Sequence, residues 1–234
     1  HFYGDTNTLY LNAGNLSFQD ATRGSGLGAS SRQWLGFGTC FLDFDNDGWI
    51  DLFVANGHVD DRTWMPGGQP YRMPPQMYRN ERNSTFLEVS AQSGDYFHQS
   101  WIGRGVACGD LDRDGRIDLA VSHQLAPSFA LRNETEASGR SIRLLLVGVV
   151  SNRNGYTARV EVVGSVPLVT RELSGGGSFQ SAHAPELHLG LGNRDSAEIH
   201  ITWPSGIVDT HKNVETGDWI AIEGGRLWRI PSVR

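Results

Sequence analysis

The chain has 234 residues, of which 29 are glycine and 20% are charged, and its formal net charge is −6. This length is enough for one or two domains, and the acidic balance argues against a nucleic-acid-binding surface. The longest apolar run, residues 144–150, is too short to cross a bilayer.

The first predicted element is a β-hairpin over residues 9–22. Its sequence reads as strand, Asn-Gly-type turn and strand, and residues 77–90 repeat it, while residues 130–133 begin it a third time. The later copies each follow an acidic loop, whereas nothing comparable precedes the first. We therefore expect the chain to enter a repeating unit halfway through.

Residues 43–51, Asp-Phe-Asp-Asn-Asp-Gly-Trp-Ile-Asp, form the first acidic loop. Alternating carboxylates can wrap Ca²⁺, which takes about six to eight oxygen ligands, and a glycine permits the sharp turn. An EF-hand would close with Glu at its twelfth position, but this chain has Val54 there, within a strand-like alternation. We expect a calcium loop between two strands, with ligands from Asp43, Asp45, Asp47, the Trp49 carbonyl and Asp51.

Residues 110–118, Asp-Leu-Asp-Arg-Asp-Gly-Arg-Ile-Asp, repeat the same spacing. The alternative is a pair of Asx-rich turns without metal, but four clustered carboxylates repel one another unless a cation neutralises them. The sequence therefore predicts a second structural Ca²⁺ site, with ligands from Asp110, Asp112, Asp114, the Arg116 carbonyl and Asp118.

The two repeats differ by an insert between Asn56 and Gln76. Long loops in compact domains are usually functional or disordered, and this one mixes charged with aromatic residues. It either binds a ligand or caps one face of the domain and packs on the next domain. The candidate ligand-binding residues are His58, Asp60, Asp61, Arg62, Trp64 and Tyr71.

Units of four short strands are typical of propeller blades. A propeller closes with about four to eight blades, and residues 1–138 hold half a blade and two full repeats. We expect the remaining blades to come from a missing N-terminal part or from another chain. Residues 139–234 contain β runs separated by Gly, Pro and Asn, which predict a small β-sandwich or barrel.

The acidic loops with their hairpins resemble the FG-GAP/VCBS repeats of calcium-bearing propellers of the integrin α-subunit type. Residues 154–160, 171–179, 187–192 and 203–206 resemble the ASPIC/UnbV domain of the cartilage acidic protein-like family and its bacterial relatives, as do insert residues 55–58 and 70–72. One departure is Gly155-Tyr156-Thr157-Ala158, where the family usually has Gly-Ile/Val-Gly-Ala. The resemblance implies an all-β, secreted, cell-surface or periplasmic calcium-binding protein, and no defined reaction.

The predicted function is therefore a binding module for a protein or glycan partner, in which calcium is structural. The alternatives are a lyase or hydrolase acting on polysaccharide, with His58, Asp60, Asp61 or His123 on the propeller face, or a non-catalytic subunit of a larger complex. We recognise no catalytic set: the sequence contains neither a Gly-x-Ser-x-Gly elbow nor a His-Glu-x-x-His pair.

The two cysteines, Cys40 and Cys108, lie three and two residues before the first Asp of their loops. Side chains alternate along a strand, so we expect the two thiols to point to opposite faces of equivalent strands. This favours two buried thiols over a disulfide, although the sequence leaves their pairing open.

Overall fold

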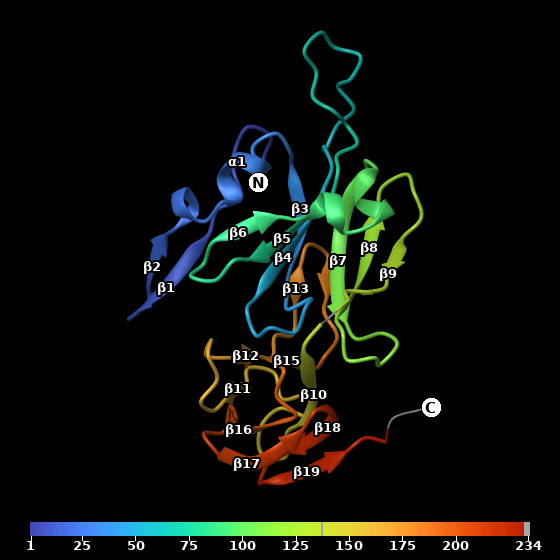
Figure 1. The fold of residues 1–234 in the computed structure, drawn as a ribbon. Coiled ribbons are helices and arrows are strands. Elements are labelled where there is room, and N and C mark those ends of the chain that lie inside the picture. The colour runs from blue at the N-terminus through green and yellow to red at the C-terminus, as the bar shows by residue number, and fades with distance from the viewer. Residues whose placement is uncertain (137, 232–234) are drawn as a thin grey trace.

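The computed structural model describes residues 1–136 and 138–231, so the last three residues of the expected second domain lie outside it. The predicted all-β class is confirmed, because strands dominate the described chain and its helices are short (Figure 1). None of the helices in the described ranges has the length and apolarity needed to span a membrane.

The N-terminal hairpin forms as predicted from β1 (Tyr10–Gly14) and β2 (Ser17–Asp20), which pair antiparallel. Its turn places Asn15 and Leu16 at φ values of 49° and 58°. Every residue of both strands is exposed. Two short helices, η1 (Thr22–Gly24) and α1 (Leu27–Ser31), lead from this hairpin to the first large sheet.

Each acidic loop joins the first two strands of a blade-like antiparallel sheet. The first sheet has the order β3 (Gly36–Leu42), β4 (Asp51–Asn56), β5 (Gln76–Asn80) and β6 (Phe86–Glu88). The 3₁₀ turns η2 (Ser90–Gln92) and η3 (Asp95–His98) then lead to the second sheet, β7 (Gly103–Gly109), β8 (Asp118–His123) and β9 (Phe129–Leu131).

The two blade-like sheets pack against each other through an apolar core. Cys40, Phe53, Met77, Val106 and Val121 are among its buried members, and they come from both sheets. Two blade-like sheets and one hairpin do not close a ring within the described residues.

Two four-stranded sheets in the C-terminal part enclose one further core, built on Trp203, Ile142 and Ile199 among others. The first sheet has the order β15 (Leu187–Gly192), β10 (Arg140–Val147), β18 (Gly217–Ile222) and β19 (Arg226–Arg229), in which β10 and β18 are parallel. The second has the order β12 (Thr170–Glu172), β11 (Arg159–Val162), β16 (Ser196–Thr202) and β17 (Val208–Glu215).

A small hairpin, β13 (Gly177–Ser178) and β14 (Ser181–Ala182), leaves the C-terminal part and lies against β3 and β7 (Figure 1). The Thr39 amide donates a hydrogen bond to the Ser178 hydroxyl (3.0 Å). The ring centroids of Phe37 and Phe179 are 4.9 Å apart. The hairpin therefore fastens the C-terminal part to both blade-like sheets.

The departure from the family pattern at Thr157 has a structural cost. Thr157 is exposed and adopts φ 68°, in the left-handed region, while its amide is held by the Leu173 carbonyl (2.8 Å). A residue with a Cβ is disfavoured there by about 1–2 kcal/mol, so glycine would adopt this backbone with less strain.

We predict that Thr157→Gly raises the free energy of unfolding by about 0.5–1 kcal/mol, because the relief of strain exceeds the backbone entropy that glycine loses on folding. Urea denaturation of the two proteins measures this difference. The matched control is Thr210→Gly in β17, which should lose about 0.5–1 kcal/mol. A loss at both positions would contradict the strain at Thr157.

Candidate metal centre

The first acidic loop brings three carboxylates together. Ligand oxygens of Asp43, Asp45 and Asp51 all lie within 4.8 Å of one another. The loop backbone holds them there: the Gly48 amide donates to Asp43 Oδ2 (2.9 Å), and the Phe44 amide donates to Asp51 Oδ2 (3.1 Å). The predicted ligand Asp43 thus converges with the predicted closing carboxylate, Asp51.

The turn itself is made by Gly48, whose φ of +92° favours glycine. Asp47, also predicted as a ligand, lies outside the carboxylate group: its Oδ1 accepts a hydrogen bond from the Trp49 amide (2.8 Å). Asp47 therefore shapes the turn in this structure.

Burial makes the first loop costly without a cation. It raises the pKa of Asp43 to about 7 and that of Asp51 to about 8, and it also raises the pKa of Asp45. Asp43 Oδ1 is buried and has no hydrogen-bond partner among the described residues. A buried oxygen of this kind destabilises the fold unless it is paired. The donor set, all carboxylate oxygens, fits a hard cation such as Ca²⁺.

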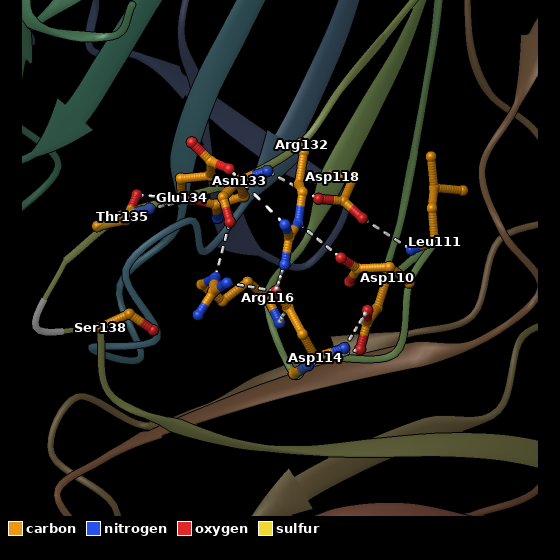
Figure 2. A network of polar contacts seen from close by, with 12 residues as sticks. Asp110, Leu111, Asp114, Arg116, Asp118, Arg132, Asn133, Glu134, Thr135 and Ser138 are labelled. Atoms are coloured by element: carbon orange, nitrogen blue, oxygen red, sulfur yellow. Dashed lines mark hydrogen bonds and ion pairs between the residues drawn. The ribbon is translucent and has the colours of Figure 1, made fainter. Parts of the chain in front are cut away.

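The second loop repeats this geometry (Figure 2). Ligand oxygens of Asp110, Asp112 and Asp118 lie within 4.8 Å of one another. The Gly115 amide donates to Asp110 Oδ2 (2.9 Å), the Leu111 amide donates to Asp118 Oδ2 (2.9 Å), and Gly115 has φ +87°. Burial also raises the pKa of Asp110.

Arginines distinguish the second loop from the first. Arg116 pairs with Asp114 (Figure 2). Arg132 Nε lies 2.6 Å from Asp112 Oδ2. The Arg116 side chain also donates to the Asn133 carbonyl (2.7 Å). Arg79, which precedes Asn80 as Arg132 precedes Asn133, turns to Glu81 instead (Nε–Oε1 2.8 Å). Arginines of its own repeat therefore pair with the carboxylates of the second loop, whereas the first loop has no such pair within its own repeat among the described residues.

An asparagine at or just after the end of the third strand of each blade-like sheet holds the closing carboxylate of its loop through its backbone amide. The Asn80 amide donates to Asp51 Oδ1 and the Asn133 amide donates to Asp118 Oδ1, both at 2.8 Å. The Arg-Asn pair is repeated in the sequence at both positions, but its role in anchoring the acidic loops was not predicted.

The C-terminal part contacts the first loop at Asn46, a loop residue that the sequence did not identify as part of the site. Its Nδ2 donates to the carbonyls of Gly115 (2.9 Å) and Gly139 (3.1 Å), and its Oδ1 lies 2.6 Å from His188 Nε2. The Gly192 amide donates to the Asn46 carbonyl (2.8 Å). One side chain thus joins both acidic loops to β15.

Arg171 brings a positive charge to the same place. Its Nη2 lies 3.8 Å from Asp43 Oδ2, so it opposes part of the carboxylate charge. Gly190 allows the close approach, because a Cβ there would overlap the Asp43 carboxylate. The Asp110 amide donates to Glu186 Oε1 (3.2 Å) at the second loop. Both loops consequently lie at the boundary between the two halves of the chain, where the first is largely buried and residues 111–114 of the second remain exposed.

The insert projects as an arm between β4 and β5 (Figure 1). His58 is buried at its base, where its amide donates to the Tyr71 carbonyl (3.0 Å) and its Nδ1 contacts the Asp60 backbone. Farther out, the exposed Asp60 pairs with Arg62 at 3.3 Å. Asp61 and Trp64 are also exposed, and the Trp64 indole is bonded only to the Asp61 carbonyl among the described groups.

His123 lies in an aromatic cluster with Tyr96, Trp101 and Phe129. Its Nε2 lies 2.9 Å from the Tyr96 hydroxyl and its Nδ1 lies 2.8 Å from the Pro127 carbonyl. Both ring nitrogens are thus engaged by the protein, which does not favour the use of His123 as a catalytic acid or base.

The two cysteines lie close together between the blade-like sheets, with Cys40 buried and Cys108 half-buried. Cys40 and Cys108 are free thiols, but their sulfur atoms lie within 4.8 Å of each other and of a His183 nitrogen. Neighbouring blades stack face to face. Opposite faces of equivalent strands therefore meet, which brings the two thiols together.

Comparisons with known proteins agree with these two halves. A family profile described as FG-GAP-like repeat matches residues 43–121, which run from the first acidic loop through the second. A profile described as ASPIC and UnbV matches residues 148–226.

The chain is also similar to cartilage acidic protein 1 from three vertebrates. It is 26% identical over 184 residues to the Xenopus tropicalis protein, and the matched region covers 74% of this chain and 26% of that protein. It is 26% identical over 186 residues to the Homo sapiens protein (75% and 26%) and over 174 residues to the Mus musculus protein (70% and 25%). The chain spans about a quarter of the length of these relatives.

Proposed function

Because the chain carries an FG-GAP-like repeat followed by an ASPIC/UnbV region, we propose that it is an extracellular-type binding module whose acidic loops hold Ca²⁺. The observation that carries this proposal is the convergence of Asp43, Asp45 and Asp51 around a buried carboxylate oxygen without a partner. A divalent cation would neutralise these carboxylates and would give the buried oxygen a partner.

In this proposal calcium is structural. Asp43, Asp45 and Asp51 would hold one ion, and Asp110, Asp112 and Asp118 a second. Neutralising the first loop also secures the contacts of Asn46, because the same turn carries both. The ions therefore stabilise the boundary between the blade-like sheets and the C-terminal part, and not only the loops themselves.

The site of action follows from the affinity expected of such loops. Extracellular calcium modules bind at about 10⁻⁴–10⁻³ M, a concentration of calcium found outside cells, so we propose a secreted, cell-surface or periplasmic protein. The exposed arm, with Trp64 and the Asp60–Arg62 pair, is the surface we assign to a protein or glycan partner. In this proposal, blades from an N-terminal part outside the given sequence or from another chain complete the propeller.

Calcium titration by calorimetry tests the proposal. The protein should bind two Ca²⁺, and the first loop should bind more tightly because Arg132 must leave Asp112 before the second loop can use that carboxylate. Asp43→Asn should remove the tighter site and Asp110→Asn the weaker one. Asp5→Asn, an exposed substitution with the same change of charge, should keep both sites. Equal calcium binding by Asp43→Asn and Asp5→Asn would refute the assignment.

A further inference from the structure

A second cluster of metal-ligating side chains lies between the two blade-like sheets, separate from the carboxylates. Ligand atoms of Cys40 on β3, Cys108 on β7 and His183 after β14 all lie within 4.8 Å of one another. The three residues come from three segments that are distant in the sequence. Their convergence therefore depends on the packing of both sheets against the C-terminal hairpin.

His183 is held in place by the edge of β7. The Ala184 amide donates to the Cys108 carbonyl (2.9 Å), and the Cys108 amide donates to His183 Nδ1 at the longer distance of 3.3 Å. The lone pair on Nδ1 therefore points at the backbone amide of Cys108. A metal ion bound by Nδ1 would have to replace only this long hydrogen bond. The ring packs on Gly177, where no Cβ could be accommodated, so its orientation is restricted.

The cluster is buried on one side and open on the other. Cys40 is 1% exposed, whereas Cys108 and His183 are half-buried. Cys108 and His183 line a cavity of about 160 Å³, which gives an ion and a solvent ligand a route to the cluster. The cluster thus has three fixed ligands and an open fourth side.

We propose that Cys40, Cys108 and His183 bind Zn²⁺ at the seam between the two sheets and the β13–β14 hairpin. Two thiolates and one imidazole are ligands that zinc prefers over calcium. Ligands about 2.0–2.3 Å from a tetrahedral ion are compatible with ligand atoms that all lie within 4.8 Å of one another. Each thiol releases its proton to solvent on binding. A disulfide would use two of the three groups and leave His183 without a role.

Cobalt substitution tests this site. Reduced, metal-stripped protein in saturating Ca²⁺ should bind one Co²⁺ with a thiolate-to-cobalt charge-transfer band, and Zn²⁺ should displace it. Cys108→Ser and His183→Ala should each weaken binding by more than about 100-fold, beyond the loss caused by an outer-shell partner. His98→Ala, an exposed histidine on η3, should bind as the unchanged protein does. Absence of the band, or an equal band in Cys108→Ser, would overturn the proposal.

A second measurement needs no variant and therefore does not depend on variant folding. Zn²⁺ at about ten times its Kd should slow alkylation of Cys40 and Cys108 in the unchanged protein about tenfold, because only the metal-free thiolate reacts, as followed by peptide mass spectrometry. Equal alkylation with and without Zn²⁺ would overturn the site. A Cys40–Cys108 disulfide in protein purified without reductant and with Zn²⁺ present would also do so.

Discussion

Removing calcium should lower the melting midpoint of the protein by about 10 °C or more. A site at 100 times its Kd contributes about 2.7 kcal/mol, and each kcal/mol shifts the midpoint of a protein of this size by about 2–4 °C. Two such sites give a shift of about 10–20 °C. The effect is large because the loss of calcium leaves the buried carboxylates Asp43 and Asp51 unneutralised.

Differential scanning calorimetry in excess Ca²⁺ and in excess chelator measures the shift. The double variant Asp43→Asn, Asp110→Asn is the control, because its midpoint should be the same in both conditions. Mg²⁺ should substitute poorly, since it demands near-ideal octahedral geometry and retains several waters. A midpoint of the unchanged protein that does not respond to the chelator would be incompatible with structural calcium.

The stabilisation by calcium should also increase with pH between about 6.5 and 8.5. In the metal-free protein, burial raises the pKa of Asp43 to about 7 and that of Asp51 to about 8, against about 3.9 in the unfolded chain. The folded state therefore binds more protons than the unfolded state in this range, so the free energy of unfolding of the metal-free protein falls as pH rises. Calcium binds the deprotonated carboxylates, so it adds most to the free energy of unfolding at the pH where the metal-free protein has lost most.

Urea denaturation in calcium-free and calcium-saturated buffer at several pH values gives the increment. Groups remote from the loops titrate alike in both buffers and cancel from it. One group near the loops acts in the opposite sense at lower pH: burial lowers the pKa of His188 to about 3, so its contribution is lost as pH falls below about 6.5. Asp51→Asn should flatten the increment. An increment that is constant or falls from pH 6.5 to 8.5 would contradict the carboxylate assignment.

The local features of the acidic loops were predictable from the sequence because they depend on short-range chemistry. Alternating carboxylates around Gly48 and Gly115 identify two turns between strands, and the flanking alternation identifies β3–β4 and β7–β8. The hairpin of residues 9–22 follows from its turn residues. The structure confirms these elements and brings three of the four carboxylates of each loop together.

The contacts between distant segments could not be predicted from such patterns. The hydrogen bonds of Asn46 depend on the placement of Gly139 and His188, which are set by the fold of the C-terminal part. Nothing in the spacing of Arg79 and Arg132 distinguishes them, yet only Arg132 turns to its acidic loop. The sequence likewise places Cys40 on a strand, but its proximity to Cys108 depends on how the neighbouring sheets stack.

The most direct test is a crystal structure determined in millimolar calcium. We predict a Ca²⁺ ion among Asp43, Asp45 and Asp51 with oxygen ligands at about 2.3–2.6 Å, and a second among Asp110, Asp112 and Asp118 with Arg132 displaced from Asp112. Both loops free of metal at that concentration, with Arg132 still paired to Asp112, would contradict the account.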